Sequence, residues 1–239
     1  MDKTPQSSCD VLVFSAHPDD SEMAMGGTLL RLVDTGYRLV HCSLTAGQMG
    51  AHGDEAGRRA EFESACRYLQ CDGRILTFRD TEVENSLAAR KEVATIIREL
   101  RPQIIFAPYH TNTQAERGGI AHADHYTAGA LIRDAAKFAR MGGLELGLPP
   151  HEVKRLFFYM IPSNVIPNII VDVSSVIDRT TELIRCYREQ MAISIGGTSV
   201  EELLRTKRAA LGVANGVRFA EPFIADELLM FEPITFFSV

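Results

Sequence analysis

The chain has 239 residues, 23% of them charged, and a formal net charge of −6 at pH 7. This length is enough for one α/β domain with a large core, and no linker or shift in composition divides residues 1–239, so we expect a single domain. The charges are spread along the chain without a basic patch or tail, which argues against nucleic acid as a partner. A small polar substrate is favoured instead.

The cysteine content and the first residues bear on where the protein works. Five cysteines form an odd set without a Cys-x-x-Cys pair, a pattern typical of reduced thiols in a cytosolic protein. The N-terminus lacks a basic segment followed by an apolar one, and no run approaches the ~20 apolar residues that cross a bilayer. We therefore expect a cytoplasmic protein with no membrane partner.

Apolar runs and helical spacings alternate through the first half of the chain. Each predicted strand is a short apolar run, and each predicted helix carries apolar side chains three or four positions apart. The predicted strands cover residues 11–16, 39–44, 74–78 and 104–107, and the predicted helices cover residues 27–33, 55–69 and 87–100. Repeated strand and helix units predict a right-handed, doubly wound, mostly parallel sheet in a three-layer, Rossmann-like α/β fold.

The second half of the chain gives weaker patterns. We expect strands over residues 155–159 and 169–173, and helices over residues 175–189 and 200–211. The end of the chain is unusually apolar, so it either packs on the chain's own core or lies in a subunit interface. Its apolar residues are Phe223, Ile224, Leu228, Leu229, Met230, Phe231, Ile234, Phe236 and Phe237.

The first predicted strand breaks into the loop His17-Pro18-Asp19-Asp20, where open α/β sheets place their chemistry. Adjacent side chains in an extended segment diverge. One carboxylate can therefore share a metal with His17 while the other faces a metal-bound water. The alternative is a capping loop, in which Asp19 or Asp20 bonds the first helical N–H groups.

A second polar segment, His122-Ala123-Asp124-His125, follows the last strand of the first half and starts a predicted helix. His122 and His125 lie on one face of this helix, and Asp124 is placed to fix an imidazole tautomer. Both polar segments leave the same end of the sheet. Two histidines and one carboxylate, with a fourth position for water, predict a catalytic zinc site. We expect the remaining histidines to be ordinary polar residues: His41, His52, His110 and His151. His52 and His110 have the alternative of contacting substrate, because they lie in loops at the active end of the sheet.

These segments resemble the motifs of a known family. Ala16-His-Pro-Asp-Asp20, Gly26-Gly27-Thr28 and His122-x-Asp124-His125 are similar to those of zinc-dependent N-acetylglucosaminyl deacetylases typified by the PIG-L and LmbE proteins. Nearly the whole chain is similar to the branch that contains the bacillithiol-biosynthesis deacetylases. That wider similarity rests on Arg58-x-x-Glu61, Arg101-Pro102, Phe157-Phe-Tyr159, Ile170-Val-Asp172-Val-Ser174, Tyr187-Arg188-x-Gln190 and Gly216-Val-Arg-Phe219-Ala-Glu221-Pro-Phe223.

The resemblance implies a metal and a reaction. Zn²⁺, or another divalent transition metal, would be held by His17, Asp20 and His125. Asp19 would be the general base that takes a proton from the zinc-bound water. The enzyme would remove the N-acetyl group from an N-acetylglucosamine-containing glycoside or oligosaccharide, releasing acetate and a free amine.

The same resemblance places further residues around this acetamido sugar. His122 would be the protonated partner of the oxyanion or of the leaving amine, held in place by Asp124. Arg58 would contact an anion or a hydroxyl and Asp80 would bind sugar hydroxyls, although Arg58 has the alternative of pairing with a glutamate on its own helix. Ala121 stands where bacillithiol-type members commonly carry an arginine for the malate carboxylate, which argues against a carboxylate-bearing aglycone.

Other functions would use the same residues differently. The same metal site acting on another acyl group would make the protein an amidase of a thiol–sugar conjugate. A non-catalytic sugar-binding relative would typically have lost a ligand or Asp19, and here all of them are present. Relatives in this branch are often hexamers, so we expect a homo-oligomer, with the hexamer as the candidate state.

Overall fold

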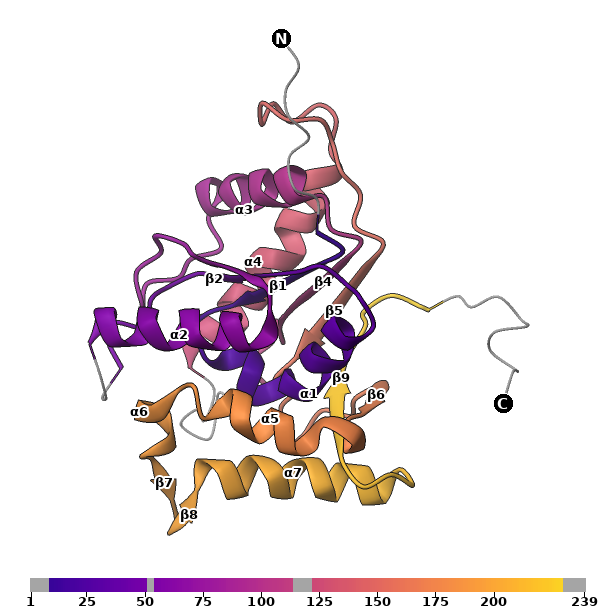
Figure 1. The fold of residues 1–239 in the computed structure, drawn as a ribbon. Helices are drawn as coiled ribbons and strands as arrows, with labels where there is room; N and C mark the ends of the chain where they lie inside the picture. The colour runs from indigo at the N-terminus through magenta and orange to yellow at the C-terminus, as the bar shows by residue number, and fades with distance from the viewer. Residues whose placement is uncertain (1–8, 51–53, 114–121, 230–239) are drawn as a thin grey trace.

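The computed structural model describes residues 9–50, 54–113 and 122–229, and a parallel five-stranded sheet lies at its centre (Figure 1). Neighbouring strands follow the order β3-β2-β1-β4-β5, so the direction of winding reverses between β1 and β4. This reversal is the topological switch point of a doubly wound sheet, and it confirms the predicted fold class. The strands are β1 (Val11–Ser15), β2 (Leu39–Ser43), β3 (Asp72–Ile75), β4 (Ile104–Pro108) and β5 (Arg155–Tyr159).

Side chains of β1 alternate between two apolar cores, one on each face of the sheet. Leu12 and Phe14 are fully buried on the face covered by α3 and α4, and Val11 and Val13 are fully buried on the face covered by α1 and α2. Burying each such side chain contributes about 1.5–3 kcal/mol. The helices are α1 (Asp20–Asp34), α2 (Glu55–Leu69), α3 (Leu87–Leu100) and α4 (Ala123–Arg140), which gives the predicted three layers.

Helix α1 begins at Asp20, seven residues before the predicted start at residue 27. The helix is interrupted at Met25, whose φ of −140° and ψ of 23° are not helical. The N–H groups of Gly27 and Thr28, which follow the interruption, donate to the buried carboxylate of Glu221 at 3.0 and 2.7 Å. Glu221 thus acts as the cap that a helix start at residue 27 requires, while the earlier turn places Asp20 inside the helix.

The second half covers the α1–α2 face of the sheet. It contains β6 (Ile169–Asp172), α5 (Ile177–Ile184), α6 (Arg188–Met191), β7 (Ser194–Ile195), β8 (Thr198–Ser199), α7 (Val200–Ala214) and β9 (Ala220–Phe223). Strands β6 and β9 form a separate antiparallel pair. The single helix predicted over residues 175–189 is wrong, because the chain leaves helical geometry at Tyr187. The buried side chain of Tyr187 turns inward, and its hydroxyl donates to Pro18 O at 2.5 Å.

Apolar segments near the end of the chain contribute to its own core. Phe223 is 1% exposed and Ile224 is 8% exposed, and Ile224 pairs with Phe158 at the end of β5. Leu228 is fully exposed, and the apolar residues from 230 onward lie outside the described residues. Over the described ranges, none of the helices combines the length and the apolar character that crossing a bilayer takes.

Candidate metal centre

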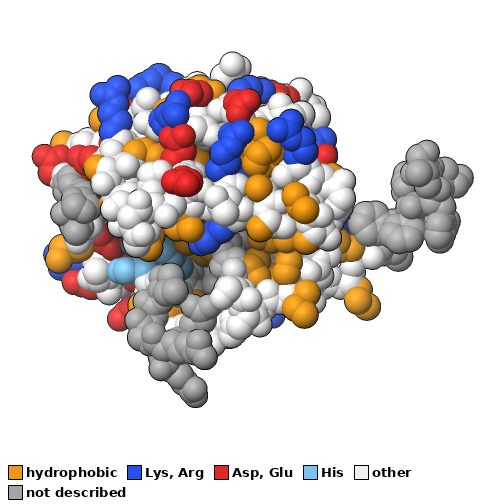
Figure 2. All heavy atoms as spheres, turned by 90° about the horizontal axis from the view of Figure 1, so that it is seen from below, with side chains coloured by type: hydrophobic (Ala, Val, Ile, Leu, Met, Phe, Trp, Pro, Cys, Tyr) orange, Lys and Arg blue, Asp and Glu red, His pale blue; other side chains and the backbone are white. Residues whose placement is uncertain are grey.

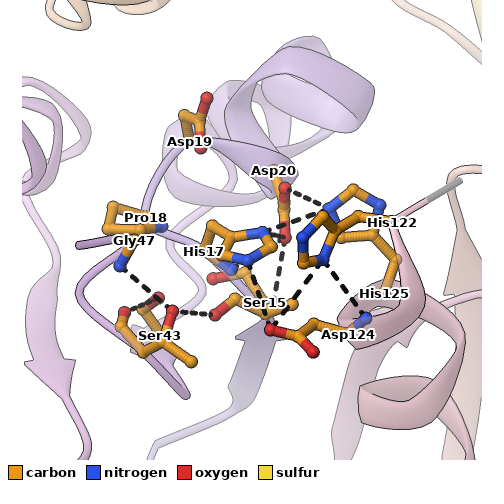
Figure 3. A network of polar contacts seen from close by, with 12 residues as sticks. Ser15, His17, Pro18, Asp19, Asp20, Ser43, Gly47, His122, Asp124 and His125 are labelled. Atoms are coloured by element: carbon orange, nitrogen blue, oxygen red, sulfur yellow. Dashed lines mark hydrogen bonds and ion pairs between the residues drawn. The ribbon is translucent and has the colours of Figure 1, made fainter. Parts of the chain in front are cut away.

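The two polar segments meet at the carboxyl edge of the sheet (Figure 3). His17 lies two residues beyond the end of β1, and His122 caps α4, the helix that follows β4 in the chain. Because β1 and β4 are parallel neighbours, the segments after them emerge at the same edge. The side chain of His122 is 41% exposed, and Figure 2 shows histidine side chains reaching the surface on the face drawn there.

Three side chains converge on one point. His17 Nδ1 lies 3.2 Å from His125 Nε2, His125 Nε2 lies 3.1 Å from Asp20 Oδ1, and His17 Nδ1 lies 3.7 Å from Asp20 Oδ2. A tetrahedral Zn²⁺ with ligands at about 2.0–2.1 Å separates them by about 3.3 Å, so these spacings fit such an ion. Two imidazole nitrogens and a carboxylate are also the donor types that zinc prefers.

Asp20 is held as an ionised ligand. Its Oδ2 accepts hydrogen bonds from the backbone N–H groups of Ala16 and His17 at 3.0 and 2.9 Å. Burial raises the pKa of this carboxyl, but His125 and His17 outweigh burial and hold the pKa well below its usual range. The capping alternative for this loop is wrong, because the N–H groups that Asp20 accepts precede the helix and Asp19 makes no side-chain cap hydrogen bond.

Two further carboxylates fix the orientation of His17. Its Nε2 lies 3.0 Å from Asp80 Oδ1 and 3.6 Å from Asp124 Oδ2, so the Nε2 proton is donated on that side and Nδ1 faces the cluster. Burial disfavours the charged imidazole, but Asp124, Asp20 and Asp80 together raise the pKa of His17 to about 12. A metal ion binding at Nδ1 would therefore displace a proton.

The two carboxylates behind His17 are themselves anchored by backbone. The N–H of Thr81 donates to Asp124 Oδ2 at 2.7 Å, and the N–H of Met49 donates to Asp80 Oδ2 at 2.8 Å. Asp80 and Asp124, with His17 and His122, form a second set of closely spaced metal-ligand atoms. Asp80 therefore has a role in orienting His17. Its contact with sugar hydroxyls stays a prediction.

Asp19 lies apart from the ligand cluster, as Figure 3 shows, although it directly precedes Asp20. The residue is 8% exposed, and its Oδ2 lies 3.8 Å from Arg58 Nη1. Burial and the charge of Asp20 raise the pKa of Asp19 to about 6. A carboxylate with such a pKa is ionised at neutral pH and basic enough to accept a proton during a reaction.

His122 lies beside His17 on the more exposed side of the centre. The two ring centroids are 4.9 Å apart, in an edge arrangement. His122 Nδ1 accepts the backbone N–H of Asp124 at 3.3 Å and lies 3.8 Å from the Asp124 carboxylate. This capping contact favours the tautomer in which Nε2 carries the proton.

Arg58 is buried in contact with the loop that follows β2. Its Nε donates to Gly47 O at 3.3 Å, and its Nη1 is buried without a hydrogen-bond partner. The sequence left Arg58 the alternative of pairing with Glu61 on the same helix. Glu61 Oε1 instead accepts the N–H of Glu189 at 3.2 Å, and the contacts of Arg58 are to Asp19 and Gly47.

Sequence reasoning missed a buried pair behind the centre. His41 and Glu22 are both 0% exposed, and His41 Nδ1 lies 3.1 Å from Glu22 Oε1. The signal was a histidine between apolar neighbours within a central strand. Of the other histidines expected to be ordinary, His151 bonds Pro102 O at 2.7 Å, His110 pairs with an aspartate at 2.9 Å, and His52 lies outside the described residues.

Histidines and ionised carboxylates around one point, at the switch point of a parallel sheet, form a cluster that could hold a metal ion, as in hydrolases with a Rossmann-like α/β fold. The chain belongs to the PIG-L family: the family profile, described as GlcNAc-PI de-N-acetylase, matches residues 12–136. The chain is 33% identical over 224 residues to diacetylchitobiose deacetylase of Thermococcus kodakarensis, covering 88% of this chain and 80% of that protein.

Two solved structures are similar over most of the chain. The conserved protein TT1542 from Thermus thermophilus has a TM-score of 0.84 and 32% identity, over 94% of this chain and 98% of that one. The N,N'-diacetylchitobiose deacetylase from Pyrococcus horikoshii, complexed with an inhibitor, has a TM-score of 0.80 and 29% identity, over 98% of this chain and 88% of that one. These likenesses extend beyond residues 12–136 into the second half of the fold.

Proposed function

We propose that this protein is a metal-dependent deacetylase that hydrolyses the N-acetyl group of an N-acetylglucosamine-containing substrate, giving acetate and a free amine. The convergence of His17, Asp20 and His125 carries the proposal, because this triangle has the spacing of three ligands around one zinc ion. Kinship with diacetylchitobiose deacetylases supports the substrate class.

His17, Asp20 and His125 would hold the metal, with zinc as the proposed ion. When bound, the metal polarises the acetamide carbonyl and lowers the pKa of water from about 15.7 towards ~7. The protein's part is to orient His17 and to keep Asp20 ionised. Asp80 orients His17 by accepting a hydrogen bond from its Nε2–H, and the backbone N–H groups of Ala16 and His17 stabilise the Asp20 carboxylate.

Asp19 is the proposed general base. The attacking water gives a proton to the Asp19 carboxylate, and its oxygen adds to the acetamide carbon. The pKa of about 6 suits this step, since burial and Asp20 make the carboxylate more basic than a solvated one. Arg58, 3.8 Å from Asp19, keeps the carboxylate in place and presents the buried Nη1 that we propose as a contact for a substrate hydroxyl.

His122 is the proposed partner of the charge that develops on the carbonyl oxygen and of the leaving amine. Its Nδ1 faces the N–H of Asp124, so its Nε2–H is the group that donates to the oxyanion. The C–N bond then breaks as the amine nitrogen receives the proton that Asp19 took from the attacking water, and acetate and the free amine leave. Asp124 fixes the imidazole by accepting from Thr81 N and facing both His122 and His17.

The group attached to the N-acetylglucosamine unit, the aglycone, is a separate part of this proposal. Ala121, the residue that argues against a malate-type carboxylate, lies outside the described residues. The described carboxylates at the centre are paired with basic side chains, Asp19 with Arg58 and both Asp80 and Asp124 with His17. Because position 121 is alanine and not arginine, we propose neutral sugar units as substrates in preference to acidic glycosides.

A substrate screen tests the function. Zinc-loaded protein is assayed for amine release from N-acetylglucosamine, diacetylchitobiose, an N-acetylglucosaminyl malate and an amide of a thiol–sugar conjugate, with Asp19→Ala as the matched control. We expect release from the first two and none with Asp19→Ala. Activity on the thiol conjugate alone would favour the amidase, and absence of any release would refute the proposal.

We also propose a cytoplasmic homo-oligomer, with the hexamer as the candidate state. All five cysteines are free thiols, as expected in a reducing compartment. Ile166 is 89% exposed and Ile170, on β6, is 36% exposed, so apolar side chains are available there for a contact with a second copy. Light scattering of the purified protein at several concentrations tests the assembly.

A further inference from the structure

A closed polar network lies beneath the metal centre, on the α2 side of the sheet. It consists of His41 on β2, Glu22 in α1, Ser15 at the end of β1 and Ser21, which follows Asp20. His41, Glu22, Ser15 and Ser21 are all 0% exposed. The metal centre and the proposed chemistry use none of these four side chains.

The donors and acceptors of this network can be assigned from its distances. Ser21 Oγ donates to Glu22 Oε2 at 2.9 Å, so its oxygen is left to accept from His41 Nε2 at 3.2 Å. His41 Nε2 also lies 3.0 Å from Ser15 Oγ, and His41 Nδ1 lies 3.1 Å from Glu22 Oε1. Both ring nitrogens therefore face oxygen. Although burial lowers the pKa of His41, Glu22 and the side chain of Cys66 together raise it to about 10.

The contacts of His41 with Ser15 and Ser21 lie at the two ends of the loop that carries the proposed metal ligands. Ser15 ends the strand that leads into the ligand loop, residues 16–20, and Ser21 begins the chain that leaves it. One imidazole nitrogen therefore ties the two ends of the loop that carries His17, Asp19 and Asp20. The middle of the same loop is fixed separately, through the hydroxyl of Tyr187 on Pro18 O at 2.5 Å.

We propose that His41 is a positioning residue that sets the geometry of the ligand loop through Ser15 and Ser21. Glu22 holds the imidazole of His41 in the orientation that reaches both serines. Metal ligands must keep their spacing within about 0.2 Å, which a loop tied only by its own backbone does not ensure. His41 touches neither the metal ligands nor the substrate position; it acts through the two serines. The inference rests on the proposed function, because it assigns a task in the same site.

The matched test deletes buried hydroxyl groups beside the ligand loop and, as a control, one in the middle of α1. Ser15→Ala/Ser21→Ala removes both ties and leaves the His41–Glu22 pair in place. Thr28→Val is the control, since Thr28 Oγ1 also donates to a buried glutamate, Glu221, at 2.8 Å but lies away from the ligand loop. Each protein is measured for zinc affinity by competition with a chelator, for the visible spectrum of its Co²⁺ form, and for kcat and KM.

We expect the double variant to bind zinc at least about tenfold more weakly, with an altered Co²⁺ spectrum and a lower kcat at similar KM. Thr28→Val should keep the parent's metal affinity, spectrum and kcat even if its melting temperature falls. Equal metal affinities and spectra in the two variants would overturn the proposal. If the double variant does not fold, Ser15→Ala, which removes one tie on β1, provides the same comparison.

The outcomes separate this inference from the proposed function. A parent protein that binds Co²⁺ but releases no amine refutes the deacetylase proposal, while its spectra still decide the role of His41. A parent that deacetylates normally, with a double variant indistinguishable from Thr28→Val, refutes only the positioning role.

Discussion

His17 Nδ1 lies 3.2 Å from His125 Nε2, although 108 positions separate the two residues in the chain. Each histidine belongs to the segment that follows one of two neighbouring parallel strands, β1 and β4. Their proximity is thus a result of topology: the doubly wound order brings these two carboxyl ends together, and the loops need only supply the side chains. Changes within the loops are therefore expected to alter chemistry without altering the fold.

Replacing Asp19 by Asn should remove activity while leaving the metal bound. The side chain keeps its size but no longer accepts a proton, so kcat is expected to fall by about 10²–10⁴-fold, the usual contribution of a general base. Amine release and zinc content are measured on the same sample. A variant that retains zinc and hydrolyses as fast as the parent would show that another group takes the proton.

Removing the metal should lower stability as well as activity. Several carboxylates surround His17, and a bound cation favours the folded state by about 2.7 kcal/mol at a hundredfold excess over its dissociation constant. Chelator-treated protein is expected to melt at a lower temperature and to recover on addition of Zn²⁺. His125→Ala should lose this metal-induced shift, whereas His151→Ala, whose ring bonds Pro102 O, should keep it. The same shift in both variants would contradict the assignment of His125.

The sequence patterns were sufficient where local structure decides the outcome. Helices 55–69 and 87–100 and strand 155–159 have the predicted bounds, because the spacing of their apolar residues defines them, and Pro102 also stops the second helix. The polar loops were also recognisable, since a His and two Asp directly after a buried strand have few structural uses. Parallel pairing of β1 with β4 then made their convergence predictable.

The patterns were insufficient where a contact joins distant segments. Helix α1 begins early and is interrupted because Glu221, almost 200 residues later, caps Gly27 and Thr28. The helix over residues 175–189 is broken because Tyr187 turns to bond Pro18. Such choices depend on tertiary partners, and helical spacing in one segment contains no information about them.

Glu221 is expected to be among the residues most important for stability. It is 0% exposed, and besides the two N–H groups of α1 it accepts Arg208 Nε at 2.7 Å. Glu221→Ala leaves the buried Arg208 charge unpaired, which should lower the free energy of unfolding by about 3–5 kcal/mol. Urea unfolding measures this change.

The control for Glu221→Ala is an ion pair nearer the surface, between Arg185 and Glu201. Arg185 Nε lies 2.9 Å from Glu201 Oε2, but the two side chains are 50% and 35% exposed, so Glu201→Ala should cost no more than about 1 kcal/mol. Similar losses in Glu221→Ala and Glu201→Ala would show that the buried carboxylate does not act as a cap for α1.

Stability should fall as the pH rises because of the buried His41–Glu22 pair. His41 titrates near 6.5 in an unfolded chain, while in the folded protein its pKa is raised to about 10. Below pH 6.5 both states hold the proton and the pair contributes fully. Between pH 6.5 and 10 only the folded state keeps it, so the free energy of unfolding should fall by up to about 1.4 kcal/mol per pH unit.

The comparison protein is His41→Gln/Glu22→Gln, in which two neutral amides replace the charged pair. Urea unfolding of both proteins is followed from pH 6 to pH 10 after chelation, since metal binding has its own pH dependence. Titration of His17 and the other groups is common to both proteins and cancels in the difference. The stability advantage of the parent over the variant should therefore shrink steadily across this range. Parallel curves would mean that His41 is already neutral in the folded state and that the pair carries no charge.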